Sequence, residues 1–226
     1  MDRPSGVDDS TRKRLYLASS SPRRRQMIRW LGIAVETLTV EVDERALPHE
    51  TPPALAARLA QAKAREARRT VGGAAWVLAA DTVVDLDGQA LGKPAHDGEA
   101  AAMLRELRGR VHKVHTGVAL AFPKGLILVR RVTTFVRMRT YSEEDLRFYV
   151  ASGDPLDKAG AYAIQHHDFQ PVEKVEVCYA NVVGLPLCAV VRLLLEAGWP
   201  LIVDVRTLCA RHFNYTCPRP DAGEAL

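Results

Sequence analysis

Residues 15–31 read LYLASSSPRRRQMIRWL, and this stretch decides how the chain begins to fold. Its apolar start over residues 15–18 predicts a short buried strand. A serine-rich loop follows over residues 19–21, and Pro22 suits the first turn of a helix, where its missing N–H is not needed. Apolar residues then recur at helical spacing. The stretch therefore predicts a strand, a tight loop and a helix whose N-terminus faces the loop.

Three arginines, Arg23, Arg24 and Arg25, fall in the first turn of this predicted helix. Positive charge there opposes the helix dipole, which favours anions at a helix N-terminus. A bound phosphate would reverse that balance, and the planar fork of arginine fits phosphate oxygens. The alternative is a solvated basic cluster. Both readings apply to all three arginines on helix energetics alone.

The composition restricts the class of protein. The 226 residues are 47% hydrophobic, enough for one sizeable core or two small lobes. The net charge of +4 is a mild basic excess, which does not by itself indicate a nucleic-acid binder. No apolar run is long enough to span a membrane, and the polar N-terminus is unlike a signal peptide. We expect a cytoplasmic protein with neither a membrane nor a stable nucleic-acid partner.

The four cysteines lie at positions 178, 188, 209 and 217, without CxxC spacing. This pattern is weak evidence for a metal site or a disulfide framework, and reduced thiols are expected. A bridge between Cys209 and Cys217 stays open.

Helical and strand-like segments mix along the chain, and adjacent strand-like runs in the middle suggest antiparallel hairpins. The sequence therefore predicts an α/β fold with a mixed twisted sheet and flanking helices. Strands are expected over residues 15–18, 35–42, 76–86, 113–122, 125–132, 133–141, 157–165 and 172–179. Helices are expected over residues 22–31, 52–70, 97–107 and 142–152. Residues 181–186 are expected to form a turn, and a last helix follows it and ends near Gly198. Residues 1–14 are expected to be a disordered lead-in, 15–200 one domain, and 201–226 a tail of unknown role.

Asp81 is the strongest single pointer to chemistry. It is a carboxylate inside a run that is otherwise apolar from Trp76 to Val84. A buried ionised carboxylate is costly unless it is paired or metal-bound. Asp81 therefore has a cationic partner, binds a metal, or has a raised pKa, unless it lies at an exposed strand end. The candidate cationic partners are Arg23, Arg24, Lys63 and Lys93.

Glu44, at the end of a predicted strand, is the expected second acid. Two carboxylates among several cations are typical of a magnesium-assisted reaction on a phosphate ester. His112 and His115 are expected to point to opposite faces of a strand, so a zinc site is not expected. The chain has no P-loop and no GxGxxG motif, and no G-x-S-x-G elbow surrounds its serine loop.

These motifs together resemble the Maf family of nucleoside triphosphate pyrophosphatases. The resemblance covers roughly residues 15–200 and is strong because the motifs follow one another in the family's order. They are LYLASSSPRR (15–24), VDE (42–44), AKA (62–64), ADTVV (80–84), GKP (92–94), TGV (116–118), DKAGAY (157–162) with Gln165, and residues 181–187. The resemblance implies the fold of Maf and ITPase proteins, with two lobes around a deep cleft. It also implies a divalent metal cofactor (Mg²⁺ or Mn²⁺) and a homodimer.

The resemblance also implies roles for single residues. Asp81 matches the proposed proton acceptor, and Glu44 matches an acid on the metal side. The sequence around residue 160 resembles that of the dTTP/UTP branch of the family. Enzymes of that branch produce the nucleoside monophosphate and pyrophosphate. Positions linked to base choice in that branch match Arg24, Thr82 and Gln165, and positions linked to the phosphates match Arg23, Lys63 and Lys93, with Ser19 also in the substrate site. Arg25 matches none of these positions and is expected to be solvated.

The implied role is removal of unwanted nucleotides, possibly modified pyrimidine nucleotides, with a possible link to cell-division arrest. The alternatives are a pyrophosphatase for another base (CTP or 7-methyl-GTP) and a non-catalytic nucleotide or nucleic-acid binder. The amide of Gln165 suits the O4 and N3–H of uracil or thymine, and the flipped amide suits cytosine.

Two departures from the family pattern affect the expected base pocket. Residues 166–169 (HHDF) replace the usual Gly-rich turn, and residues 176–180 (EVCYA) stand where a Gly-containing turn is common.

Overall fold

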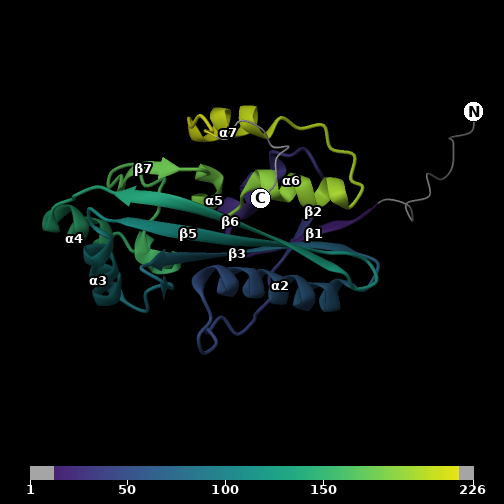
Figure 1. Ribbon diagram of the computed structural model, residues 1–226, viewed down its shortest axis with the longest axis horizontal. Coiled ribbons are helices and arrows are strands. Elements are labelled where there is room, and N and C mark those ends of the chain that lie inside the picture. Colours follow the sequence, from purple (N-terminus) through teal and green to yellow (C-terminus); the bar gives the residue numbers. More distant parts are fainter. Residues whose placement is uncertain (1–12, 219–226) are drawn as a thin grey trace, which may run out of the picture.

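A computed structural model describes residues 13–218 of the chain (Figure 1). Its centre is a seven-stranded sheet with the order β2-β1-β3-β5-β6-β7, in which β4 also pairs with β3. The strands are β1 (Leu15–Ala18), β2 (Val35–Leu38), β3 (Trp76–Leu86), β4 (Gln89–Leu91), β5 (Val111–Ala121), β6 (Ile127–Met138) and β7 (Val172–Glu176). β1 runs parallel to both of its neighbours, and the other pairs are antiparallel. The predicted mixed sheet is confirmed.

Helices flank both faces of this sheet (Figure 1). α2 covers one face, α6 and α7 lie over the other, and α3 and α4 lie at the end where β6 finishes. The helices are α1 (Pro22–Arg29), α2 (Pro52–Val71), α3 (Asp97–Leu107), α4 (Glu143–Ala151), α5 (Tyr179–Val183), α6 (Leu187–Glu196) and α7 (Val205–Phe213), with short 3₁₀ turns η2 (Asp154–Asp157) and η3 (Ala159–Ala161).

Four predicted strands differ from the structure. The runs 125–132 and 133–141 form one continuous strand, β6. The strand expected over 157–165 is wrong, because the segment folds into η2 and η3, with Gly160 at φ 69°. This turn lies close to the sheet, since a Cβ on Gly160 would lie 3.0 Å from Val84. The strand expected over 172–179 ends at Glu176, and α5 then occupies much of the expected turn.

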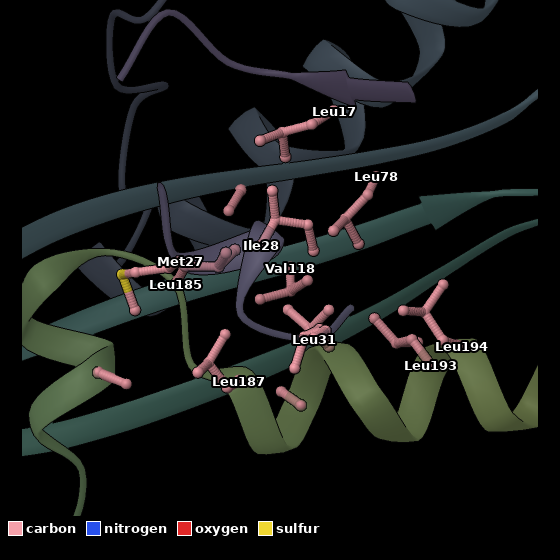
Figure 2. Close-up of a cluster of buried hydrophobic side chains, with 14 of the residues drawn as sticks. Leu17, Met27, Ile28, Leu31, Leu78, Val118, Leu185, Leu187, Leu193 and Leu194 are labelled. Atoms are coloured by element: carbon pink, nitrogen blue, oxygen red, sulfur yellow. The ribbon is translucent and has the colours of Figure 1, made fainter. Parts of the chain in front are cut away.

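The apolar core explains the position of α1 (Figure 2). Met27 and Ile28 are buried against side chains of the sheet and of α6. The sticks of Leu17, Leu78 and Val118 come from the sheet, and those of Leu187, Leu193 and Leu194 from α6. Because α1 buries this stripe, its arginine-bearing first turn is held at the end of β1.

α2 approaches the opposite face through small residues. Ala60, Ala64 and Ala67 pack against Ala79 and Ala119. Gly117 allows the closest approach, because a Cβ there would lie 2.3 Å from the carbonyl oxygen of Ala56. A side chain at this position would push α2 away from the sheet.

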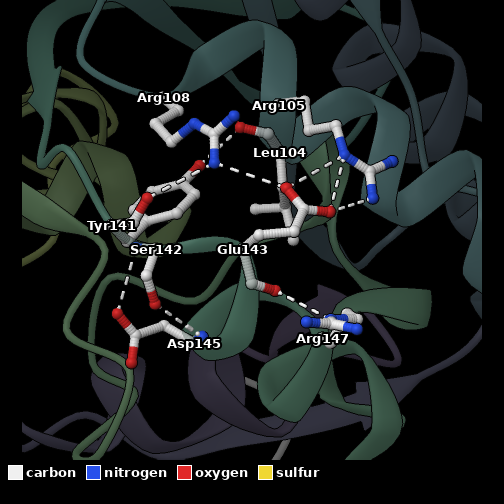
Figure 3. A network of polar contacts seen from close by, with 8 residues as sticks. All are labelled: Leu104, Arg105, Arg108, Tyr141, Ser142, Glu143, Asp145 and Arg147. Carbon is white, nitrogen blue, oxygen red and sulfur yellow. Dashed lines mark hydrogen bonds and ion pairs between the residues drawn. The ribbon is translucent and has the colours of Figure 1, made fainter.

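A polar network joins α3 to α4 (Figure 3). Tyr141 Oη donates to the carbonyl oxygen of Leu104 at 2.5 Å, and Arg105 and Arg108 pair with Glu143. A capping box of Ser142 and Asp145 starts α4. A second buried cluster lies beneath these helices, separate from the core around α1 and α6.

The segment after residue 200 folds onto the domain. α7 buries Val205 and Cys209, and His212 stacks on Trp30 with ring centroids 3.9 Å apart. Cys209 and Cys217 are not joined in a disulfide. Lys13 Nζ donates to the carbonyl oxygens of Ala197 and Gly198.

Residues 1–12 of the lead-in predicted over 1–14, and residues 219–226 of the tail predicted over 201–226, lie outside the described residues. Between residues 13 and 218, no helix has both the length and the apolar character needed to cross a membrane.

Candidate active site

A gap along one edge of β3 creates the site. On this edge β3 pairs with β1 over residues 76–79 and with β4 over residues 84–86. The residues between these two pairings, 80–83, therefore face an opening. A cavity of about 370 Å³ lies there, lined by residues from all four buried apolar clusters of the described chain and from the loops around them.

The cavity brings together every residue that the sequence nominated for substrate or metal. They are Ser19, Arg23, Arg24, Glu44, Lys63, Asp81, Thr82, Lys93 and Gln165. The register explains part of this convergence: Ala18 pairs with Ala79, so the serine loop after β1 lies beside Asp81. Their placement in one cavity is shown, and their roles stay predictions.

β3 separates the site into two sides. Successive side chains of a strand point to opposite faces of the sheet, so Asp81 and Thr82 diverge. Asp81 meets Lys63 of α2, and Thr82 meets Arg24 of α1.

The acidic side is a tight cluster around one ammonium group. Lys63 Nζ lies 2.5 Å from Asp81 Oδ1 and 2.6 Å from Glu44 Oε1. Asp81 is 7% exposed. The predicted cationic partner of Asp81 is thus Lys63, and the exposed strand end is excluded.

The pKa values of the two acids shift in opposite net directions, although burial acts to raise both. Desolvation raises the pKa of Asp81, although the charges of Lys63 and Arg24 oppose it. Desolvation would also raise the pKa of Glu44, but the hydrogen bond and charge of Lys63, helped by Lys93, lower it overall. An aspartate with a raised pKa is a better proton acceptor than an ordinary one, which makes Asp81 the stronger base of the pair.

Arg24 is held by two hydrogen bonds on the other side of β3. Its Nε donates to the carbonyl oxygen of Gly184 at 2.7 Å, and its Nη2 donates to Thr82 Oγ1 at 2.9 Å. Burial lowers the pKa of this guanidinium. The remaining N–H groups of Arg24 can donate to a ligand in the cavity.

Thr116 completes this arrangement, and the sequence reasoning did not single it out. Its hydroxyl lies 2.9 Å from Thr82 Oγ1 and donates to the carbonyl oxygen of Asn181 at 3.1 Å. Thr82 must therefore donate to Thr116, which leaves its lone pairs for Arg24. The sequence carries no local signal for this role, which follows from the pairing of Thr82 with Thr116 across β3 and β5.

The serine loop is built around the other arginines. Ser21 caps α1 by accepting from the N–H of Arg24, and the N–H of Ser21 donates to Ser19 Oγ. Arg25, expected to be solvated, instead donates through Nε to the carbonyl oxygen of Ser19 at 2.9 Å. Arg23 lines the cavity from the same turn.

Lys93 lines the cavity from the loop after β4. This loop is tied to η3, because the N–H of Gly160 donates to the carbonyl oxygen of Gly92 at 3.0 Å. Residues 157–165, which were predicted to be a strand, thus form a turn that packs on β3 and supports the Lys93 loop.

The histidines take no part in the site. His112 contacts the hydroxyl of Tyr162, and burial lowers the pKa of its imidazole to about 4. His115 contacts Asp85 and Thr133 instead. Within residues 13–218, no cluster of three or more histidine, cysteine or acidic side chains could hold a metal ion.

The two carboxylates of Glu44 and Asp81 fit a magnesium ion better than zinc. Magnesium is commonly held by one or two carboxylates together with phosphate oxygens and water. Zinc would need three or four protein ligands, usually with histidine or cysteine among them. The donor set is therefore complete only when a phosphate ligand is present.

Residues 166–169 and 176–180, where the chain departs from the family pattern, lie outside the lining of the cavity. The structure describes all of these residues.

The chain matches one protein family and several named relatives along most of its length. A model of the Maf-like protein family matches residues 14–197. A protein of Thermomicrobium roseum named dTTP/UTP pyrophosphatase is 50% identical over 198 residues, which are 86% of this chain and 89% of that protein. One of the same name from Symbiobacterium thermophilum is 45% identical over 189 residues, 84% of this chain and 96% of that protein. The structure of the Staphylococcus aureus Ham1 protein is 18% identical, with a TM-score of 0.46, and the match covers 82% of this chain and all of that one (100%).

Proposed function

Because this chain belongs to the Maf-like protein family, we propose that it hydrolyses dTTP and UTP to the nucleoside monophosphates and pyrophosphate. The observation that carries the proposal is the cluster of Asp81, Lys63 and Glu44 in one cavity with Arg23, Arg24 and Lys93. Two carboxylates, one of them the base, and several cations around one opening are what attack of water on a phosphate requires.

The reaction begins with water near Asp81. Its carboxylate orients the water and accepts a proton as the water attacks the α-phosphorus. Lys63, at 2.5 Å from Asp81 Oδ1, fixes the carboxylate and can also meet a phosphate oxygen. In this proposal Asp81 accepts the proton of the water, and Lys63 holds the Asp81 carboxylate in position.

The leaving pyrophosphate gains negative charge, and cations must stabilise it. Arg23 and Lys93 line the cavity and are placed for this role, together with the serine loop around Ser19. Glu44 and Asp81 would hold Mg²⁺ or Mn²⁺, which supplies charge neutralisation on the phosphate oxygens when bound.

The base lies on the Thr82 side of β3 in this proposal. The chain Arg24–Thr82–Thr116 is fixed in donor direction, so the free N–H groups of Arg24 face the cavity as donors. Uracil and thymine offer carbonyl oxygens, whereas the exocyclic amine of cytosine would face another donor. Gln165 lines the same cavity and can pair with the remaining polar edge of the base.

The wider role we propose is removal of unwanted pyrimidine triphosphates from the nucleotide pool by a homodimer in the cytoplasm. The named relatives support the substrate class. The oligomeric state is open to direct measurement by light scattering.

A panel of triphosphates tests the proposal. With Mg²⁺ present, we expect pyrophosphate release from dTTP and UTP to exceed that from CTP and 7-methyl-GTP by about tenfold or more in kcat/KM. Enzyme without divalent metal is the control and should be inactive. Preference for CTP or 7-methyl-GTP would contradict the proposed base, and orthophosphate as the first product would contradict the proposed reaction.

A further inference from the structure

The loop that carries Gln165 is built without the glycines usual at this point. The N–H of His166 donates to the carbonyl oxygen of Ala163, and the N–H of Phe169 donates to His166 Nδ1 at 3.0 Å. Arg139 donates to the carbonyl oxygens of Phe169 and Gln170 at 2.6 Å each. The loop is therefore a self-bonded turn anchored from outside the cavity.

Tyr149 of α4 lies at the centre of this turn. Its ring is fully buried and stacks on Phe169, with centroids 4.3 Å apart, while His166 meets it edge-on at 4.7 Å. Residues 166 and 169, the departures from the family pattern, thus form the packing around one tyrosine.

The hydroxyl of Tyr149 joins two segments of backbone. It accepts a hydrogen bond from the N–H of Ala163 at 2.9 Å and donates one to Asp154 Oδ2 at 2.8 Å. Lys158 holds the other carboxylate oxygen of Asp154 at 2.9 Å. Burial raises the pKa of Tyr149, so the phenol stays a donor to Asp154 at ordinary pH. Ala163 is thereby fixed two residues before Gln165.

This placement bears on base choice because of the symmetry of an amide. Gln165 offers one donor and one acceptor, and a flip of its amide exchanges preference for uracil with preference for cytosine. The flip is a rotation within the side chain, so the backbone acts on it through position. A fixed Ala163 sets the place at which the Gln165 amide meets the ring, whereas a loose loop would let the amide adjust to either base.

We propose that Tyr149 is a positioning residue for base selection: its hydroxyl, held by Asp154, fixes Ala163 and so the edge that Gln165 presents to a pyrimidine. This inference rests on the proposed function, since it places the base at Gln165. It adds a residue outside the cavity to those that determine specificity.

The test compares two tyrosine variants. Tyr149→Phe removes the hydroxyl and keeps the ring. Tyr141→Phe is the matched control, because Tyr141 is also buried and also contacts Phe169, but its hydroxyl donates to Leu104 on α3 (Figure 3). The readouts are kcat and KM for UTP and CTP, and affinities for their non-hydrolysable α,β-imido analogues.

We expect Tyr149→Phe to lower the preference for the UTP analogue over the CTP analogue by about fivefold, the effect of one lost hydrogen bond. KM for UTP should rise by a similar factor, with kcat within about twofold of wild type. Tyr141→Phe should keep the wild-type preference. If Tyr149→Phe fails to fold, Asp154→Asn tests the same link from outside the core and should lower the preference in the same direction.

The results that would overturn the inference differ from those that overturn the proposed reaction. An unchanged preference in Tyr149→Phe, an equal loss in Tyr141→Phe, or no pyrimidine preference in the wild type would overturn the positioning role. Preferential binding of the UTP analogue without any pyrophosphate release from UTP would contradict the proposed reaction and leave the positioning role standing.

Discussion

Replacement of Asp81 by asparagine is expected to lower kcat for UTP hydrolysis by about 10³-fold with the fold intact. Asparagine has the same shape but cannot accept the proton of the attacking water. Because burial raises the pKa of Asp81, folding favours the neutral acid, and its ionisation costs stability as the pH rises through that pKa. The neutral amide avoids this cost, so the melting temperature of Asp81→Asn at neutral pH should equal or exceed that of wild type.

The measurement is single-turnover kinetics of pyrophosphate release, with circular dichroism as the check on folding. Asp85→Asn is the matched control, since Asp85 is also buried on β3 but pairs with His115 outside the cavity. It should keep most of the wild-type rate. A rate for Asp81→Asn within tenfold of wild type would exclude Asp81 as the base.

Replacement of Lys63 by methionine is expected to lower kcat/KM by about 10²-fold. The variant removes the ammonium that touches both carboxylates. It should also move the pH dependence. The charge of Lys63 lowers the pKa of Asp81, so its loss raises that pKa further. Since the base must be ionised, the acidic limb of the pH–rate profile should shift to higher pH.

The profile of kcat/KM against pH measures both effects. Lys174→Met serves as the control, because Lys174 pairs with Glu176 at the surface, with its side chain 64% exposed. Neither its rate nor its profile should change. An acidic limb that stays in place, or moves to lower pH, in Lys63→Met would show that Lys63 does not act on Asp81.

The residues of the site could be nominated from sequence because each stands out locally. Asp81 is a charge in an apolar run, and Arg23 and Arg24 oppose a helix dipole. Period and capping signals also placed α1, α2 and α3 close to their observed bounds. These features depend on neighbours in the chain, which the sequence displays directly.

Other features depend on contacts between distant segments. The segment 157–165 resembles a strand in its small residues, but Gly160 takes a positive φ so that the turn can pack on Val84. The role of Thr116 follows from its pairing with Thr82, and register between strands is not visible locally. α7 forms part of the core through Trp30, at the other end of the chain. Tertiary packing decides all three.

The two sides of the site were also hidden in the sequence. Asp81 and Thr82 are adjacent in the chain, yet they lie on opposite faces of the sheet. Asp81 accepts a hydrogen bond from Lys63, and Thr82 accepts one from Arg24. The missing strand neighbour between β1 and β4 lets one cavity reach both faces. In the function that we propose, this gap lets the Asp81 side and the nucleobase side of the cavity act on one substrate.

The most direct test of the central claim is hydrolysis of UTP in ¹⁸O-labelled water, followed by mass spectrometry of both products. Attack of water on the α-phosphorus predicts one ¹⁸O atom in UMP and none in pyrophosphate. Label in pyrophosphate would show attack on the β-phosphorus, and release of labelled orthophosphate would show attack on the γ-phosphorus. Either result would contradict the assignment of Asp81 and its cluster to the α-phosphate.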